Sequence, residues 1–209
     1  MIGQITDDLE RLRLLGGGRP LGPATTTKHL IRNGAVVTHD GQVTADQAEV
    51  APEELPHLRR CVELAAEAVD AGDFPFGSVL VAADGRVLAE DRNREVSMGD
   101  ATRHPEFELA RWAAENMTAA DRAAATVFTS GEHCPMCSSA HAWVGLGRIV
   151  YVSSSRQLTA WLTELGVLGV GPSPVRPLAI NEVAPGLAVQ GPVPGLDEQV
   201  HDLHRRFRS

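Results

Sequence analysis

The sequence has few basic residues for its length. It contains 19 lysines and arginines against 27 aspartates and glutamates, so its formal net charge is -8 at neutral pH. A protein of this charge repels phosphate backbones on average, which argues against nucleic acid as a partner. The basic residues cluster only at the end of the chain, in residues 204–208. There they are typical of a solvated helix terminus.

Cysteines and long apolar runs are also scarce. Three cysteines, two of them in a Cys-x-x-Cys pair, do not make a disulfide framework and suit a reducing compartment. The sequence contains no apolar run of the roughly 18 residues that span a bilayer. Residues 1–13 carry acidic side chains where a signal peptide has a basic start. We therefore expect a soluble, cytoplasmic protein without a membrane partner.

The length and local composition predict one domain with an appendage. Residues 1–52 contain a Gly16-Gly17-Gly18 run followed by prolines, which indicates an N-terminal extension that is partly flexible. Within it, residues 30–37 and the turn dipeptide Asp40-Gly41 predict two short strands joined by a turn. Residues 53–209, including a C-terminal helix, are expected to form a single catalytic domain.

From Pro52 onward, the hydrophobic pattern alternates between helical and strand spacing. Apolar residues from Leu58 to Val69 predict a helix, and the Asp84-Gly85 turn separates two strands of a hairpin. Further strands are predicted at 126–129 and 149–152, with helices starting near His104 and Cys134. A helix at 157–165, an extended segment at 175–180 and a last helix at 196–207 complete a predicted α/β sandwich.

A cluster of potential metal ligands is the most informative pattern in the chain. His104-Pro105-Glu106 and Cys134-Pro135-Met136-Cys137 supply one imidazole, two thiols and a carboxylate. Zinc prefers nitrogen and sulfur ligands, and a catalytic zinc has three protein ligands with one open position. Each proline favours a helix start, so both segments should present their ligands at helix N-termini. We predict that His104, Cys134 and Cys137 bind Zn²⁺ and that Glu106 moves protons.

Other interpretations of the same residues remain open. The cysteine pair alone could be a redox dithiol, and a structural zinc could recruit His133 or Cys61 as a fourth ligand. Glu106 could be an exposed carboxylate that the helix dipole favours. The full set of His-x-Glu and Cys-x-x-Cys favours the catalytic interpretation.

Residues 53 to about 155 resemble the cytidine deaminase superfamily, in particular its guanine deaminase and tRNA adenosine deaminase branch. The resemblance rests on the metal motifs, on Phe74-Pro75-Phe76-Gly77-Ser78, on Asn93, and on Thr129-Ser130-x-Glu132. It implies a three-layer α/β/α fold with a mixed five-stranded sheet, usually assembled as a homodimer. It also implies that zinc and Glu106 release ammonia hydrolytically from an aromatic heterocycle.

The resemblance extends to substrate contacts. Asn93 falls where these enzymes keep a base-binding asparagine, although an asparagine at a strand end is often only a turn residue. Further candidates for substrate contact are Phe76, Gly77, Ser78, Pro105, His133 and Phe207. Phe207 lies on the last helix, which we expect either to cover the pocket, in its own or a partner subunit, or to pack on the sheet.

Three departures from the family pattern bear on the substrate. Pro105 replaces an alanine whose backbone N–H in many relatives contacts a substrate carbonyl, and proline has no N–H. His133 replaces a proline; it could support the metal site, touch substrate or fill a slot, and we favour the slot. Residues 165–169 lack the acidic pair of guanine deaminases, which disfavours guanine. We expect a free nucleobase or a small aminated heterocycle as substrate, of the cytosine, isocytosine, guanine or aminotriazine type. The alternatives are a tRNA adenosine deaminase and a non-catalytic zinc-stabilised binding protein.

Overall fold

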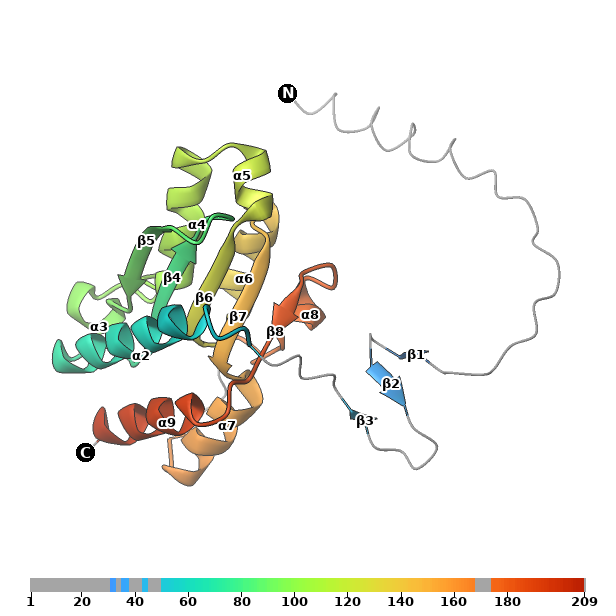
Figure 1. Cartoon of the computed structure of the whole chain (residues 1–209). Coiled ribbons are helices and arrows are strands. Elements are labelled where there is room, and N and C mark those ends of the chain that lie inside the picture. Colours follow the sequence, from blue (N-terminus) through green and yellow to red (C-terminus); the bar gives the residue numbers. More distant parts are fainter. Residues whose placement is uncertain (1–30, 33–34, 38–42, 45–49, 168–173, 209) are drawn as a thin grey trace, which may run out of the picture. The chain divides into compact units, whose positions relative to one another are not determined.

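The computed structural model describes residues 31–32, 35–37, 43–44, 50–167 and 174–208 (Figure 1). The chain divides into two compact units, residues 1–46 and residues 47–209. In the first unit, β1 (Ile31–Arg32), β2 (Ala35–Val37) and β3 (Val43–Thr44) form an antiparallel sheet in that order. The structure thus has a third strand in addition to the predicted pair. Most of the predicted extension, including Gly16–Gly18 and the Asp40-Gly41 turn, lies outside the described residues.

The second unit is built on a mixed five-stranded sheet, as predicted. Its strands are β4 (Gly77–Val81), β5 (Val87–Arg92), β6 (Thr126–Gly131), β7 (Arg148–Ser153) and β8 (Val189–Gln190). Their order in the sheet is β5-β4-β6-β7-β8. The pairs of β4 with β5 and β6 are antiparallel, whereas β6, β7 and β8 run parallel.

Helices cover both faces of this sheet, and each face has its own core (Figure 1). On one face, the α2 (Leu55–Asp70) residue Leu58 packs with Val79, Phe128 and the α9 (Leu196–Arg206) residue Val200. On the other face, Leu80 packs with residues of α4 (Pro105–Asn116). Val79 and Leu80 alternate between the two cores because successive side chains of a strand point to opposite faces.

The remaining helices are α3 (Glu95–Met98), α5 (Ala119–Ala124), α6 (Pro135–Val144), α7 (Ser155–Glu164) and α8 (Ile180–Val183). The sequence pattern did not reveal α3 and α5, since four and six residues are too few to show a helical period. None of the helices in the described part of the chain is long and apolar enough to cross a membrane.

The predicted extended segment at 175–180 supplies no strand to the sheet, and its last residue is helical. Residues 175–179 belong to no strand, and Ile180 begins α8, where its backbone N–H donates to Glu132 Oε1 at 2.9 Å. The fifth strand lies further along the chain, at Val189–Gln190, where it pairs with β7. Two residues cannot show the apolar and polar alternation by which a strand is recognised.

Gly77 marks the point where α2 and β4 approach most closely. A Cβ atom at this position would lie 2.4 Å from Leu64 Cβ and 2.6 Å from the Cys61 carbonyl oxygen. The backbone N–H of Gly77 donates to Ser130 Oγ at 3.1 Å. Glycine is therefore needed for helix-to-sheet packing, whatever its relation to substrate.

We expect Gly77→Ala to lower the free energy of unfolding by about 1–3 kcal/mol, because overpacking forces the helix and the strand apart. Gly186→Ala is the matched control, since a Cβ there has no heavy atom within 4 Å. This control should stay within about 0.5 kcal/mol of the wild type in urea denaturation. Equal stability of the two variants would contradict the close approach of α2 to β4.

Candidate active site

The N-termini of α4 and α6 hold the predicted metal ligands. His104 is the N-cap of α4, with φ -86° and ψ 136°, and Cys134 is the N-cap of α6, with φ -66° and ψ 168°. Both residues are extended because each precedes a proline, and Pro105 and Pro135 then start the helices. Cys137 follows one turn into α6. The expectation that both helix starts present ligands is confirmed.

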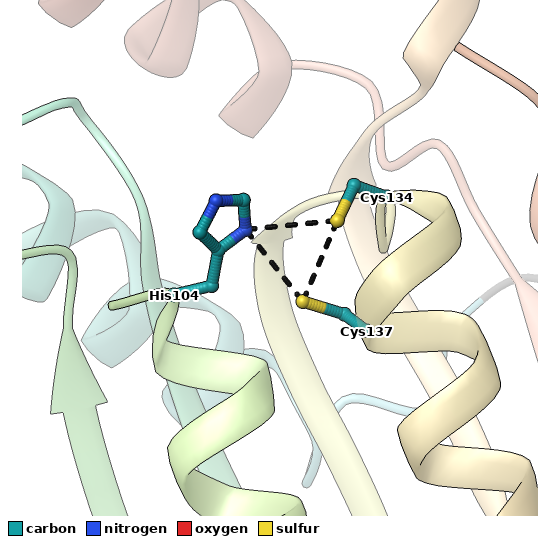
Figure 2. Close-up of side chains that lie close together, drawn as sticks. All are labelled: His104, Cys134 and Cys137. Carbon is teal, nitrogen blue, oxygen red and sulfur yellow. Dashed lines mark hydrogen bonds between the residues drawn. The ribbon is translucent and has the colours of Figure 1, made fainter. Parts of the chain in front are cut away.

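The three ligand atoms form a nearly equilateral triangle (Figure 2). His104 Nδ1 lies 3.6 Å from both Cys134 Sγ and Cys137 Sγ, and the two sulfurs are 3.6 Å apart. Tetrahedral zinc with sulfur at about 2.3 Å and nitrogen at about 2.0–2.1 Å requires edges of about 3.5–3.8 Å. The triangle therefore fits zinc in both ligand type and size.

Among the residues that the structure describes, this cluster has three potential ligands and no fourth. Cys61 of α2 faces the core, and His133 packs edge-on against His141 with ring centroids 5.4 Å apart. Neither residue joins the triangle, so the interpretation as a closed structural zinc site finds no support. The hydrogen-bonding contact between Cys134 and Cys137 lowers the pKa of Cys134 to about 4, which favours its thiolate at neutral pH.

Glu106 lies beside the triangle of ligand atoms and is buried, with 6% of its surface exposed. Its Oε1 atom is 3.0 Å from Ser78 Oγ and 2.9 Å from Thr129 Oγ1. Its Oε2 atom faces the cluster, 3.6 Å from Cys137 Sγ. Burial raises the pKa of Glu106 above its ordinary value, although the charge of His104 opposes the shift. A carboxyl group in this position can exchange protons with a molecule bound next to the metal ligands.

A cavity of about 200 Å³ opens onto His104, Cys134 and Glu106. Phe76 contributes to one wall of the cavity, and its contact with substrate stays a prediction. Helix α7 contributes a second wall that the sequence did not suggest. The other lining residues are Glu132, Pro135, Ser155, Leu158, Thr159, Leu162, Pro177 and Leu178. Glu132 belongs to the Thr129-Ser130-x-Glu132 motif. Its oxygens accept hydrogen bonds from the backbone N–H groups of Ser155, at 2.7 Å, and Ile180, at 2.9 Å.

The other predicted substrate contacts do not line this cavity. Ser78 is fully buried and bonds to Glu106, and Gly77 packs beneath α2. Pro105 is buried in the first turn of α4. His133 is 1% exposed, and neither of its ring nitrogens has a hydrogen-bond partner. The role of these residues toward substrate stays a prediction.

Asn93 and Phe207 also have partners within the protein. The Asn93 side chain is fully buried and bonds to Glu95. The Phe207 ring lies 5.0 Å from that of Phe74. Helix α9 reaches the cavity only indirectly, through His204, which packs edge-on against Phe76 at 5.4 Å. Of the two expectations for this helix, the contact favours the one in which it packs on the domain over the one in which it covers the pocket. Residues 165–169, which lack the acidic pair of guanine deaminases, are described only as far as residue 167.

A tetrahedral zinc ion held by three protein ligands would keep one coordination position open, as in zinc sites of the catalytic type. Residues 51–153 match the family model described as the cytidine and deoxycytidylate deaminase zinc-binding region. These residues therefore form a zinc-binding domain of the cytidine and deoxycytidylate deaminase type.

Relatives of known or assigned activity differ in their substrates. The chain is 33% identical over 110 residues to a probable cytosine deaminase of Schizosaccharomyces pombe, covering 53% of this chain and 66% of the relative. It is 36% identical over 94 residues to a tRNA-specific adenosine deaminase of Agrobacterium fabrum, covering 43% and 61%. The chain thus spans less than two thirds of the length of either relative.

The fold is also that of a solved deaminase structure. The guanine deaminase from Nitrosomonas europaea superimposes with a TM-score of 0.54 and 23% identity, over 75% of this chain and 84% of that protein. At this identity the likeness concerns the fold, which agrees with the predicted cytidine deaminase-like architecture.

We expect one zinc ion per chain in the purified protein, and its loss in Cys134→Ala. The variant should also melt at a lower temperature, because metal binding is coupled to folding. Cys61→Ala serves as the control: this cysteine lies outside the triangle, so the variant should keep its zinc. Metal analysis and thermal melts check both. Full zinc occupancy in Cys134→Ala would contradict the ligand assignment.

Proposed function

We propose that the protein is a zinc-dependent hydrolytic deaminase of a free nucleobase or a related small aminated heterocycle. The position of Glu106 carries this proposal. A buried carboxylate with one oxygen held by two hydroxyls and the other facing three metal ligands has the arrangement of a proton shuttle. A non-catalytic zinc-stabilised protein would not require this carboxylate, which costs free energy to bury.

In the proposed reaction, water adds to the ring carbon that carries the amino group, and ammonia leaves. When bound by His104, Cys134 and Cys137, zinc would supply Lewis-acid activation of water at neutral pH. Glu106 takes up a proton from the attacking water. It delivers this proton to the ring nitrogen. It then takes the proton of the newly added hydroxyl and delivers it to the departing amine, so the carbon–nitrogen bond breaks, a carbonyl forms and the carboxylate is regenerated.

The size and lining of the cavity support a small substrate. Its volume of about 200 Å³ lies below the range of about 300–1,000 Å³ for sites that hold drug-sized ligands. Leu158 and Leu162 of α7 and Leu178 provide apolar surface against which a flat ring can lie. A single ring system suits this space.

A tRNA adenosine deaminase is the second candidate, because relatives of that kind are similar to this chain. The net charge of -8 disfavours it, since binding of a polynucleotide rests largely on neutralising its phosphates.

The expected homodimer and cytoplasmic location remain proposals. Trp143 of α6, which is 87% exposed, is a side chain of the kind that a subunit interface covers.

We expect Glu106→Gln to lower kcat by about 10² to 10⁴ while zinc content and fold are kept, because the amide cannot shuttle protons. Glu108→Gln is a matched control on the same helix, where Glu108 pairs with Arg103 at 3.2 Å instead of facing the cluster. The control should stay within a fewfold of wild type in an ammonia-release assay. Comparable activity of both variants would mean that another residue moves the protons.

The substrate class is tested by ammonia release from cytosine, isocytosine, guanine and aminotriazines, with unmodified tRNA assayed in parallel. We expect at least one small heterocycle to be turned over, with guanine a poor substrate, and no deamination of tRNA. Salt-sensitive tRNA binding together with deamination of a single adenosine would replace this proposal by the second candidate.

A further inference from the structure

The two ring nitrogens of His104 face different groups. Nδ1 points to the sulfurs of Cys134 and Cys137, each at 3.6 Å, and Nε2 lies 3.2 Å from Glu95 Oε1. In a neutral imidazole, one nitrogen carries the proton and the other a lone pair. An acceptor at Nε2 keeps the proton there and leaves the Nδ1 lone pair for a metal.

Glu95 is itself held by Asn93. The Asn93 amide nitrogen donates to Glu95 Oε1 at 2.8 Å, and the Glu95 backbone N–H donates to Asn93 Oδ1 at 3.0 Å. The backbone N–H of Asn93 donates to the Phe76 carbonyl oxygen at 2.9 Å, and the residue is fully buried. Both ends of the Asn93 amide are therefore bonded to Glu95.

The short helix α3, which begins at Glu95, is anchored from the end of α2. Asp73 is fully buried, and its oxygens accept hydrogen bonds from the Ser97 backbone N–H and hydroxyl, both at 2.8 Å. Arg92 donates to the same carboxylate at 3.0 Å. An isolated helix of four residues is not stable, so its place depends on these bonds. They set the position from which Glu95 reaches His104.

We propose that Glu95 is a positioning residue for the metal site, and that Asn93 holds Glu95 in place. This inference rests on the zinc site of the proposed function. A carboxylate that accepts from the second nitrogen of a ligand histidine fixes its tautomer and ring orientation and raises its basicity. The contacts run from Asn93 through Glu95 to His104. Glu95 is the first residue of α3, the helix that Asp73 anchors.

Alternative roles for Glu95 predict different behaviour. As a direct metal ligand it would stand in the ligand cluster, but among the described residues that cluster comprises only His104, Cys134 and Cys137. As a purely structural residue in the turn after Asn93, it would affect stability but not metal affinity. Zinc affinity measured on folded protein separates these roles without any assay of activity.

The test is chelator competition for zinc on wild type, Glu95→Gln, Glu95→Ala and Asn93→Ala, with melting of the metal-free proteins measured alongside. Glu95→Gln loses the charge but keeps an acceptor oxygen, so we expect zinc affinity to fall about tenfold, and up to about a hundredfold in Glu95→Ala. Asn93→Ala should also weaken zinc binding. Glu108→Gln, which removes a nearby carboxylate that pairs with Arg103, should not.

The zinc affinities of the variants test the roles of Glu95 and Asn93 separately. Wild-type affinity in both Glu95 variants, provided that they fold, would overturn the positioning role. An Asn93→Ala variant with unchanged zinc affinity but a raised KM would overturn the assignment of Asn93. If the wild type itself bound no zinc, the proposed function would fail instead. Cobalt substitution gives a second readout, since a changed absorption spectrum in Glu95→Gln at full occupancy reports altered ligand geometry.

Discussion

Helices α4 and α6 begin close together at one end of the sheet, and the arrangement of the site depends on this convergence. A proline in each first turn sets the point at which the chain changes from extended to helical, so His104 and Cys134 become N-caps. The side chains of His104, Cys134 and Cys137 then meet at 3.6 Å. Helix N-termini carry partial positive charge, which favours the thiolates that a metal requires.

The register of the central strands sets the position of the Glu106 carboxylate. Ser78 of β4 and Thr129 of β6 are direct partners in the antiparallel pairing, and their hydroxyls are 2.9 Å apart. Glu106, one residue into α4 from the proline, reaches these two hydroxyls with one carboxylate oxygen. A shift of one residue in this pairing would turn the hydroxyls to the opposite face. The same contacts compensate for burying a carboxyl group that would otherwise be costly.

Residues that resemble substrate contacts in the sequence have mostly structural partners in the fold. Asn93 bonds to Glu95, Ser78 bonds to Glu106, and Gly77 permits the contact of α2 with β4. Much of the cavity wall comes instead from α7 and from residues 177–178. The spacing of the motifs thus indicated which residues cluster as metal ligands, but it did not indicate which residues form the cavity wall. Apolar wall residues such as Leu158 cannot be told in the sequence from ordinary core positions of a helix.

The sequence alone determined the cluster of potential metal ligands, the carboxylate next to it and the order of the main helices and strands. These features depend on residue type at short spacing, such as a proline beside each ligand, and on hydrophobic periods that run over a full helix or strand. Tertiary structure alone decided the contact of Glu95 with His104, the anchoring of α3 by Asp73 and the position of β8. These depend on contacts between residues far apart in the chain or on elements of only two to four residues, whose local sequence carries no periodic signal.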